Sequence, residues 1–256
     1  MTKIFDDRAR QELLQWYVKP DLSNVRPHSL QVMQIDAKTA RGYIASFHYS
    51  RTMPDSTRFA YGLYYGSILC GVCTFGMGCG KNQYTAICPD VKNGEYLELT
   101  RLWLEDSLGR NSESYFIGKC IRMLPKNIRF IVSFSDEKQG HFGYIYQASN
   151  FVYFGKNGGG KMLVTKDGIE KHPRLLGIYR MRHPEYKEYT TKQLMDLLGY
   201  QYVTGGKKFR YVYFKDKKLK NALKVKALPY PKKTENKKDG KYSDEFRKGG
   251  DGNETD

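Results

Sequence analysis

The chain has 256 residues, of which 40% are hydrophobic and 27% are charged, and its formal net charge at pH 7 is +16. This length and composition indicate one main folded domain with an appendage and exclude a wholly disordered chain. No apolar run approaches about eighteen residues, and the first twenty residues lack the apolar core of a signal peptide. We therefore expect a cytoplasmic protein that does not bind membranes.

The excess positive charge lies before residue 229. Residues 201–228 hold nine basic residues and one acidic residue, interleaved with tyrosine and phenylalanine, whereas residues 229–256 hold seven of each sign. Basic side chains among aromatic rings are typical of surfaces that bind the phosphate backbone of nucleic acids. A solvated lysine-rich face that only keeps the protein soluble is the alternative. The final segment has too few apolar residues to build a core, and we expect it to be disordered.

Hydrophobic periodicity along the chain predicts alternating helices and strands. The first half should form a helix, a short strand, a second helix, a β-hairpin with its turn at Tyr65-Gly66, and a further strand. A helix, a mostly apolar strand, a short helix and another strand follow, and then a hairpin turn, a helix, a strand and a basic helix. These elements occupy residues 8–18, 28–36, 40–48, 58–76, 94–104, 111–124, 128–136, 139–150, 151–155, 166–168, 191–199, 208–214 and 217–224.

The order of the elements predicts an α/β (α+β) fold, in which a mixed sheet is flanked by helices. The apolar strand at 128–136 should lie in the centre of this sheet, because both of its faces need cover. In a sheet of this kind, functional side chains tend to gather at the carboxyl ends of the strands. The polar stretch that follows this strand is therefore the first place to look for a site.

The cysteines allow a metal site to be considered. There are five of them, an odd number in a chain of ordinary size, which indicates reduced thiols and not a disulfide framework. Cys70 and Cys73 have the spacing of a zinc knuckle, but they fall in a predicted strand, where side chains three apart point to opposite faces. We interpret them as small buried hydrophobic residues.

Histidines and a carboxylate offer a second metal hypothesis. His48, His141 and Asp136 could be brought together by the fold as a two-histidine, one-carboxylate set, which would suit iron. His48 ends a predicted helix, so a role as a C-terminal cap is the alternative. Asp136 could equally be the N-cap of the element that follows it.

Charged and hydroxyl side chains mark two further positions. Glu98 and Arg101 lie three apart in a predicted strand, so they face opposite sides unless a bulge intervenes. Burying either charge is costly without a partner, which indicates that one of them faces a cleft. Asn111 or Ser112 should cap the next helix, and Ser114 in its first turn could combine capping with phosphate binding.

Three blocks of sequence resemble one known family. They read FHYSRTMP, then ELTRLWLEDSLGRNSESYFIGKCIRML, then IVSFSDEKQGHFGYIYQASNFVYFG, and together they span residues 47–155. In this order they resemble the Mom family of bacteriophage DNA-adenine modification proteins, which are similar to GNAT acyltransferases. The resemblance implies transfer of a small carbamoyl-bearing group to the exocyclic N6 amine of adenine in phage DNA. This modification would protect the DNA from host restriction enzymes.

The resemblance also assigns roles to particular residues. The motif positions implied as catalytic are His48, Tyr49, Ser114, Asp136 and Tyr146, and Gln139 and His141 lie in the same block. Arg101, Arg110 and Ser114 would hold the donor. The loop EDSLGRNSES departs from the glycine-rich phosphate loop of acyl-CoA enzymes, so the donor is either acetyl-CoA or another activated acyl species.

The partner implied by the resemblance is double-stranded DNA with a flipped adenine. An adenine must leave the stack before its amine can react. Tyr49 and Tyr146 would stack on the everted base, Asp136 or His48 would accept a proton, and Arg101 with Ser114 would stabilise charge on the donor. The side chains expected to hold the flanking phosphates are Lys207, Lys208, Arg210, Lys215, Lys217, Lys218 and Lys220.

The expected domains are an N-terminal helical segment (1–27), a GNAT-like catalytic domain (28–185), a basic DNA-binding module (186–228) and a disordered tail (229–256). Two other functions stay open. An N-acyltransferase that acts on protein or tRNA would share the fold, and a non-catalytic DNA-binding protein would explain the charge.

Overall fold

The computed structural model describes residues 2–78, 84–168, 170–171 and 173–232. Its main sheet has seven strands in the order β1-β2-β3-β4-β5-β10-β6, and a second sheet has the order β8-β7-β9. Within the main sheet β4 and β5 pair in parallel and the other neighbours are antiparallel. The strands are β1 (Gln31–Gln34), β2 (Thr57–Tyr65), β3 (Ile68–Gly76), β4 (Tyr96–Leu104), β5 (Phe130–Asp136), β6 (Val152–Asn157), β7 (Lys161–Val164), β8 (Glu170–Lys171), β9 (Gln201–Thr204) and β10 (Lys208–Phe214).

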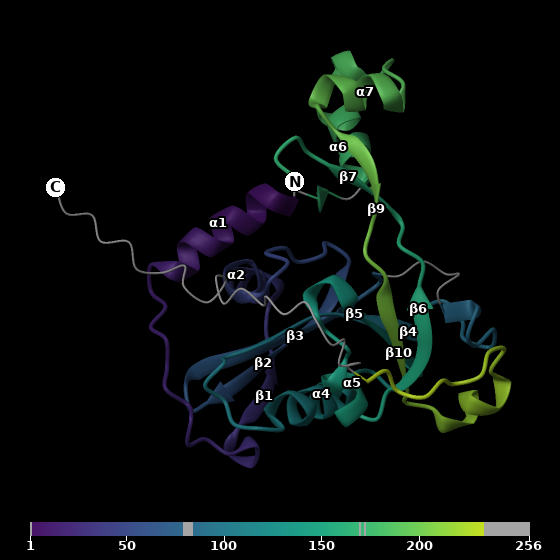
Figure 1. Cartoon of the computed structure of the whole chain (residues 1–256). Coiled ribbons are helices and arrows are strands. Elements are labelled where there is room, and N and C mark those ends of the chain that lie inside the picture. Colours follow the sequence, from purple (N-terminus) through teal and green to yellow (C-terminus); the bar gives the residue numbers. More distant parts are fainter. Residues whose placement is uncertain (1, 79–83, 169, 172, 233–256) are drawn as a thin grey trace, which may run out of the picture.

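Helices cover both faces of the main sheet (Figure 1). Helix α2 packs on one face, where its Ile44 meets Val72 and Leu69, and α1 packs on α2. On the other face, α4 inserts Phe116 and Ile117 into the largest core cluster. This mixed sheet flanked by helices confirms the expected α/β fold. The helices are α1 (Thr2–Leu14), α2 (Ala37–Phe47), α4 (Ser112–Met123), α5 (Tyr144–Ala148), α6 (Arg174–Arg182) and α7 (Thr191–Leu198).

Strand β5 is the central strand that its apolar sequence predicts. Phe130 and Val132 pack into the core on one face, and Ile131 packs into the core on the other. The alternation continues with Ser133, which is fully buried and donates to the Leu99 carbonyl oxygen at 3.2 Å. The carboxyl end of β5 therefore rests on a rigid, doubly covered strand.

Two β-bulges change which side chains share a face. At Cys70 and at Thr100, one extra residue interrupts the register with the neighbouring strand. Because of the first bulge, Cys70 and Cys73 both pack in the same core cluster on one face of the sheet, so the expectation that they face opposite sides is wrong. The second bulge lies between Glu98 and Arg101, which is the exception that would let the two side chains share a face. The charge of Arg101 is close enough to lower the pKa of Glu98.

A small lobe interrupts the main sheet between β6 and β10. This insert lobe (residues 158–206) contains the second sheet, α6 and α7, and its own core of Leu163, Leu176, Leu194 and Met195. The hairpin turn at 166–168 and α7 were expected, whereas α6 and β9 were not. The insert lobe rises from one end of β6 and β10 (Figure 1).

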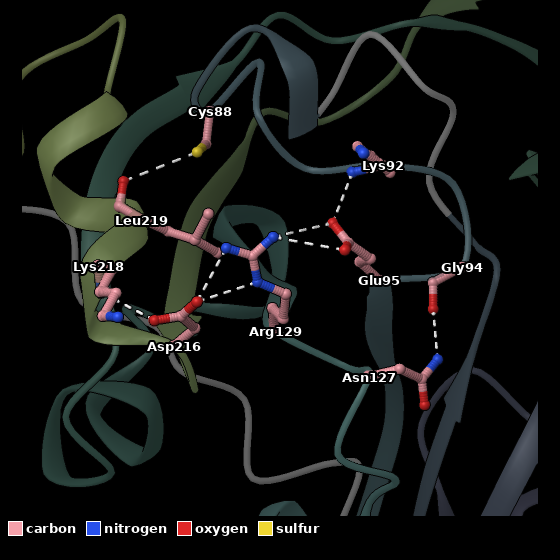
Figure 2. Close-up of polar contacts among 9 residues, drawn as sticks. All are labelled: Cys88, Lys92, Gly94, Glu95, Asn127, Arg129, Asp216, Lys218 and Leu219. Carbon is pink, nitrogen blue, oxygen red and sulfur yellow. Dashed lines mark hydrogen bonds and ion pairs between the residues drawn. The ribbon is translucent and has the colours of Figure 1, made fainter.

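Strand β10 corrects the expected basic module. It pairs with β5 and β6 inside the main sheet, so residues 186–228 do not form a separate module. The segment after β10 is a 3-10 helix, Lys217–Ala222, that is tied to the start of β5. The Arg129 guanidinium donates to Asp216 at 2.8 Å and lies 3.2 Å from Glu95 (Figure 2). This ion-pair network fixes the end of the sheet opposite the insert lobe.

Other expected boundaries shift. The first helix begins at Thr2, and in the stretch 139–150 only Tyr144–Ala148 is α-helical. The start of the expected tail is ordered, because the Tyr230 hydroxyl donates to the Phe151 carbonyl oxygen at 2.7 Å. Residues 233–256 lie outside the described residues. Within the described part of the chain, no helix combines the length and apolarity needed to cross a bilayer.

Candidate active site

A cavity opens where β4 and β5 diverge. The two strands pair only from Tyr96 to Leu99 on β4 and from Phe130 to Ser133 on β5, and beyond this point their ends separate. A cavity of about 470 Å³ lies there, within the size range of small-molecule sites. Its wall includes residues from the ends of both strands, from the end of α2 and from the loop before α5.

His48 and Tyr49 form one wall. The helix α2 ends at His48, whose amide donates to the Ile44 carbonyl oxygen, so the expected capping position is confirmed. The His48 ring is buried, with 8% exposed, and lies 4.4 Å from the Tyr49 ring between centroids. Tyr49 is 53% exposed and meets the His141 ring edge at 5.6 Å. The cavity wall thus presents an aromatic surface to solvent.

His48 is neutral in the folded protein. Burial lowers the His48 pKa to about 3, and electrostatic interactions with Arg101, His141 and Arg51 contribute in the same direction. The backbone N–H of Ser50 donates to Nδ1 at 3.1 Å, which places the ring proton on Nε2. His48 therefore offers the cavity a hydrogen-bond donor, and not the free lone pair that a general base needs.

Asp136 ends β5 at the rim of the cavity. Its Oδ1 accepts the backbone N–H of Lys138 at 2.9 Å, so the expected N-cap role is also confirmed. Within the described part of the chain, the Asp136 carboxylate accepts no hydrogen bond other than this one. Oδ2 is left to act on a ligand, and capping and proton transfer are compatible in one side chain.

Arg101 joins β4 to the loop after α2. Its Nε donates to the Thr52 carbonyl oxygen at 2.7 Å, and its Nη1 donates to the carbonyl oxygen of Thr100 at 2.6 Å. The Thr100 bulge turns Arg101 toward this loop. Arg101 lines the cavity and at the same time holds the segment that carries Tyr49.

Tyr146 lies deeper than the stacking role requires. It is only 7% exposed, and its ring packs against Phe151 and Tyr211, each at 5.4 Å between centroids. Its hydroxyl is hydrogen-bonded to Ser133, and burial raises its pKa well above the usual range. Tyr146 therefore forms the floor of the cavity, and Tyr49 is the better placed of the two rings for stacking.

The expected donor-binding residues do not converge. Arg101 lines the cavity, but Arg110 and Ser114 are not among its lining residues, and neither is Gln139. The Ser114 hydroxyl donates to the Asn111 carbonyl oxygen, a local bond within the first turn of α4. The acidic residues Glu113 and Asp106 line the cavity on this side instead.

The expected DNA-binding cations divide between the two ends of β10. Lys207 and Lys208 lie at the cavity end, where Lys208 is opposite Asp136 in the register of β10 and β5. At the far end, Lys215 donates to the carbonyl oxygens of Leu124 and Pro125, and so stabilises the end of α4. Lys217, Lys218 and Lys220 belong to the 3-10 helix at the same far end. Arg210 is half-buried in the sheet and donates to the Phe154 carbonyl oxygen, so the seven cations form no single patch.

The described residues do not support either metal hypothesis. Among the described residues, no three His, Cys, Asp or Glu side chains are placed to hold a metal ion, which applies to iron at His48, His141 and Asp136 and to zinc at Cys70 and Cys73. Cys79 lies outside the described residues.

Glu98, the second charge that was identified in β4 from the sequence, is half-buried. Its carboxylate lies against Gly78. Burial raises the Glu98 pKa to about 7, and the nearby cations Arg101 and Lys208 oppose this effect. The position of Glu98 could be read from the sequence but its partial burial could not, because this burial depends on the Thr100 bulge and on the contact with Gly78.

A cavity of this size at the diverging strand ends of an α/β sheet, lined by ionisable side chains, is typical of the active site of an enzyme. The family model of the Mom protein family matches residues 29–232. The methylcarbamoylase Mom of Escherichia phage Mu is 30% identical over 209 residues, covering 79% of this chain and 84% of that protein. The chain belongs to the Mom protein family.

Solved structures of GNAT acetyltransferases are also similar. One from Elizabethkingia anophelis with acetyl-CoA bound has a TM-score of 0.39 and 10% identity, covering 73% of this chain and 98% of that chain. The ribosomal-protein-S18-alanine N-acetyltransferase of Escherichia coli has a TM-score of 0.40 and 7% identity, covering 72% and 93%. These TM-scores are below 0.5, and the family assignment does not depend on them.

Proposed function

We propose that the protein transfers a methylcarbamoyl-type group to the exocyclic N6 amine of adenine in phage DNA, in the host cytoplasm. The observation that carries the proposal is that one cavity brings together His48, Tyr49, Arg101, Asp136 and Tyr146 from four separate parts of the chain. The family relationship to a methylcarbamoylase supports the group that is transferred. The wild-type DNA of the phage would be resistant to host restriction as a result.

The cavity is suited to an everted base. Extrusion of a nucleotide costs a few kcal/mol, and stacking on an aromatic ring returns about 1 to 3 kcal/mol. Tyr49 offers such a ring at the mouth, and the Nε2–H of His48 beside it can donate to an acceptor nitrogen of the purine. These two residues would hold the base with its amine directed toward β5.

Asp136 is the proposed general base. The N6 nitrogen is a weak nucleophile because its lone pair is delocalised into the ring, so its proton must leave as the new bond forms. Oδ2 of Asp136 would accept this proton, while the bond from Lys138 to Oδ1 fixes the carboxylate. Such a base typically contributes 10² to 10⁴ in rate. The bond between the transferred group and the rest of the donor would break in the same reaction, with its electron pair going to the leaving group, and Arg101 would stabilise negative charge that develops on the donor.

The donor is proposed to be an activated acyl species. Beyond Leu99 and Ser133, the edges of β4 and β5 that face each other are no longer paired, and their peptide groups could bind amide and carbonyl groups of the donor. A pyrophosphate at the start of α4 fits less well, because Glu113 and Asp106 place negative charge there. Acetyl-CoA is therefore the less favoured donor, and we assign no step to it.

The function is tested by mass spectrometry of nucleosides from the DNA of expressing cells. We expect modified deoxyadenosine with the wild-type protein and a loss of at least about 100-fold with Asp136→Asn, since Asn keeps the Oδ1 cap but cannot accept the proton. Asp167→Asn, in an exposed turn of the insert lobe, serves as the control and should modify DNA normally. Full modification by Asp136→Asn would exclude Asp136 as the base.

A further inference from the structure

Arg51 occupies an unusual backbone position just after His48 and Tyr49, which line the cavity. It follows Tyr49 by two residues, its amide donates to the His48 carbonyl oxygen at 2.9 Å, and its φ is 51°. This left-handed conformation disfavours residues with a long side chain, and glycine or asparagine would adopt it at lower cost. Backbone strain of this kind occurs most often at functional sites. The Arg51 side chain is exposed and can reach a ligand.

A second arginine lies beside it. On α1, Ala9 packs against α2 at Gly42, and Arg10 is the next residue, with its side chain exposed. Partial burial lowers the pKa of Arg51, and the positive charge of Arg10 acts in the same direction. Among the ion pairs of the described residues, none involves Arg10 or Arg51. Two adjacent cations without a carboxylate favour an anion from outside the chain.

The position of the pair relates it to the cavity. Tyr49 lines the cavity wall on the α2 side, and Arg51 is also close enough to influence the charge of His48. Lys207 and Lys208 lie on the opposite side, next to Asp136 at the end of β5. A nucleic-acid backbone that crossed the mouth would meet cations on both sides, with one nucleotide over the cavity between them.

We propose that Arg10 and Arg51 form a phosphate-binding site for the DNA strand that presents the target base. This inference rests on the proposed function and identifies the partner of the same site as the phosphodiester backbone on the α2 side of the mouth. It also moves the expected DNA interface away from Lys217 and Lys218. These lysines follow the far end of β10, about 20 Å along the strand from Lys208.

The test measures the salt dependence of DNA binding. Each phosphate contact contributes about 0.9 to the slope of log K against log salt. The variant Arg10→Gln/Arg51→Asn removes two cations, and asparagine suits the positive φ, so the fold should be retained. We expect its slope, from fluorescence anisotropy with a labelled duplex in a NaCl series, to be smaller than that of the wild type by about 2.

The matched control is Lys217→Gln/Lys218→Gln, which removes the same charge at the far end of the sheet. We expect the wild-type slope for this variant. A wild-type slope for the arginine variant, or an equal decrease in both variants, would overturn the inference. The proposed function has its own test. If the two arginines contribute to the salt dependence of DNA binding but the wild-type protein leaves adenine unmodified, the proposed function is wrong and the phosphate site is retained.

Discussion

At the scale of single residues, burial decides the chemistry of the site. His48 and Glu98 are both ionisable, and the fold favours the neutral form of each by opposite shifts of the pKa, downward for the histidine and upward for the carboxyl group. As the pH falls, the His48 contribution therefore decreases the free energy of unfolding, and the Glu98 contribution increases it. The motifs in the sequence pointed to His48 but gave no indication that it would lose its basicity.

The pH dependence of stability tests the buried state of His48. Because its pKa falls from 6.5 to about 3 on folding, the unfolded chain binds more protons in this interval, and stability is lost as the pH falls below 6.5. Between pH 7.5 and pH 4.5 the wild type should lose about 2 to 3 kcal/mol more than His48→Gln, measured by urea unfolding.

The exposed His28 provides the comparison for this measurement. His28→Gln should lose as much stability over the same pH interval as the wild type does. If His48→Gln and the wild type had the same pH dependence, His48 would be protonated like an exposed histidine, and its role as a neutral donor would be wrong.

The positions that line the cavity could be predicted in part from the sequence. His48, Tyr49, Arg101, Asp136, His141 and Tyr146 all lie in the recognised motifs and all line it. Ser114 does not line the cavity, because the first turn of α4 directs Glu113 toward it instead. Arg110, which precedes α4, does not line it either. Glu98 was recognised as a charge within a strand, but its raised pKa could not be predicted, since its partial burial depends on a bulge that is set by pairing between strands.

At the scale of elements, the loop between β5 and α5 is held by one close contact. Gly143 has a φ of 75°, and a Cβ at this position would overlap the Tyr211 ring. The Tyr211 hydroxyl in turn donates to the Phe142 carbonyl oxygen. This contact fixes the segment from Gly140 to Tyr146, which lines the cavity.

Gly143→Ala should therefore be more costly than its backbone conformation alone requires. The positive φ disfavours alanine by about 1 kcal/mol, and the overlap with Tyr211 should add about 1 to 3 kcal/mol. Gly168 is the matched control, because its φ is 76° and a Cβ there meets nothing within 4 Å. Urea unfolding should show a clearly larger loss for Gly143→Ala, and equal losses would show that the contact does not hold the loop.

Elements with strong periodicity were predicted well from the sequence, and irregular ones were not. The apolar runs of β2, β3 and β5 reflect burial on both faces of the sheet, which the sequence itself encodes. The strand β9 is largely exposed, so it lacks the apolar pattern that would identify it. The sequence 217–224 has helical spacing, but tertiary contacts shape it into a 3-10 turn.

At the scale of the whole molecule, the arrangement of β10 controls where charge meets chemistry. The sequence showed a basic segment at 201–228 but not that β10 would be inserted between β5 and β6. This long-range pairing splits the segment, with Lys207 and Lys208 near the cavity and the ion-pair network of Arg129 at the other end (Figure 2). Strand order in a sheet is set by such non-local contacts, which a local pattern does not reveal.

The identity of the acceptor tests the central claim most directly. DNA, tRNA and total protein from cells that express the wild-type chain are digested, and the products are analysed by mass spectrometry for the added group. The account predicts modified deoxyadenosine in DNA, with tRNA nucleosides and protein amines unchanged. Unmodified deoxyadenosine together with acylated protein or tRNA would contradict it, because the cavity would then serve a different acceptor.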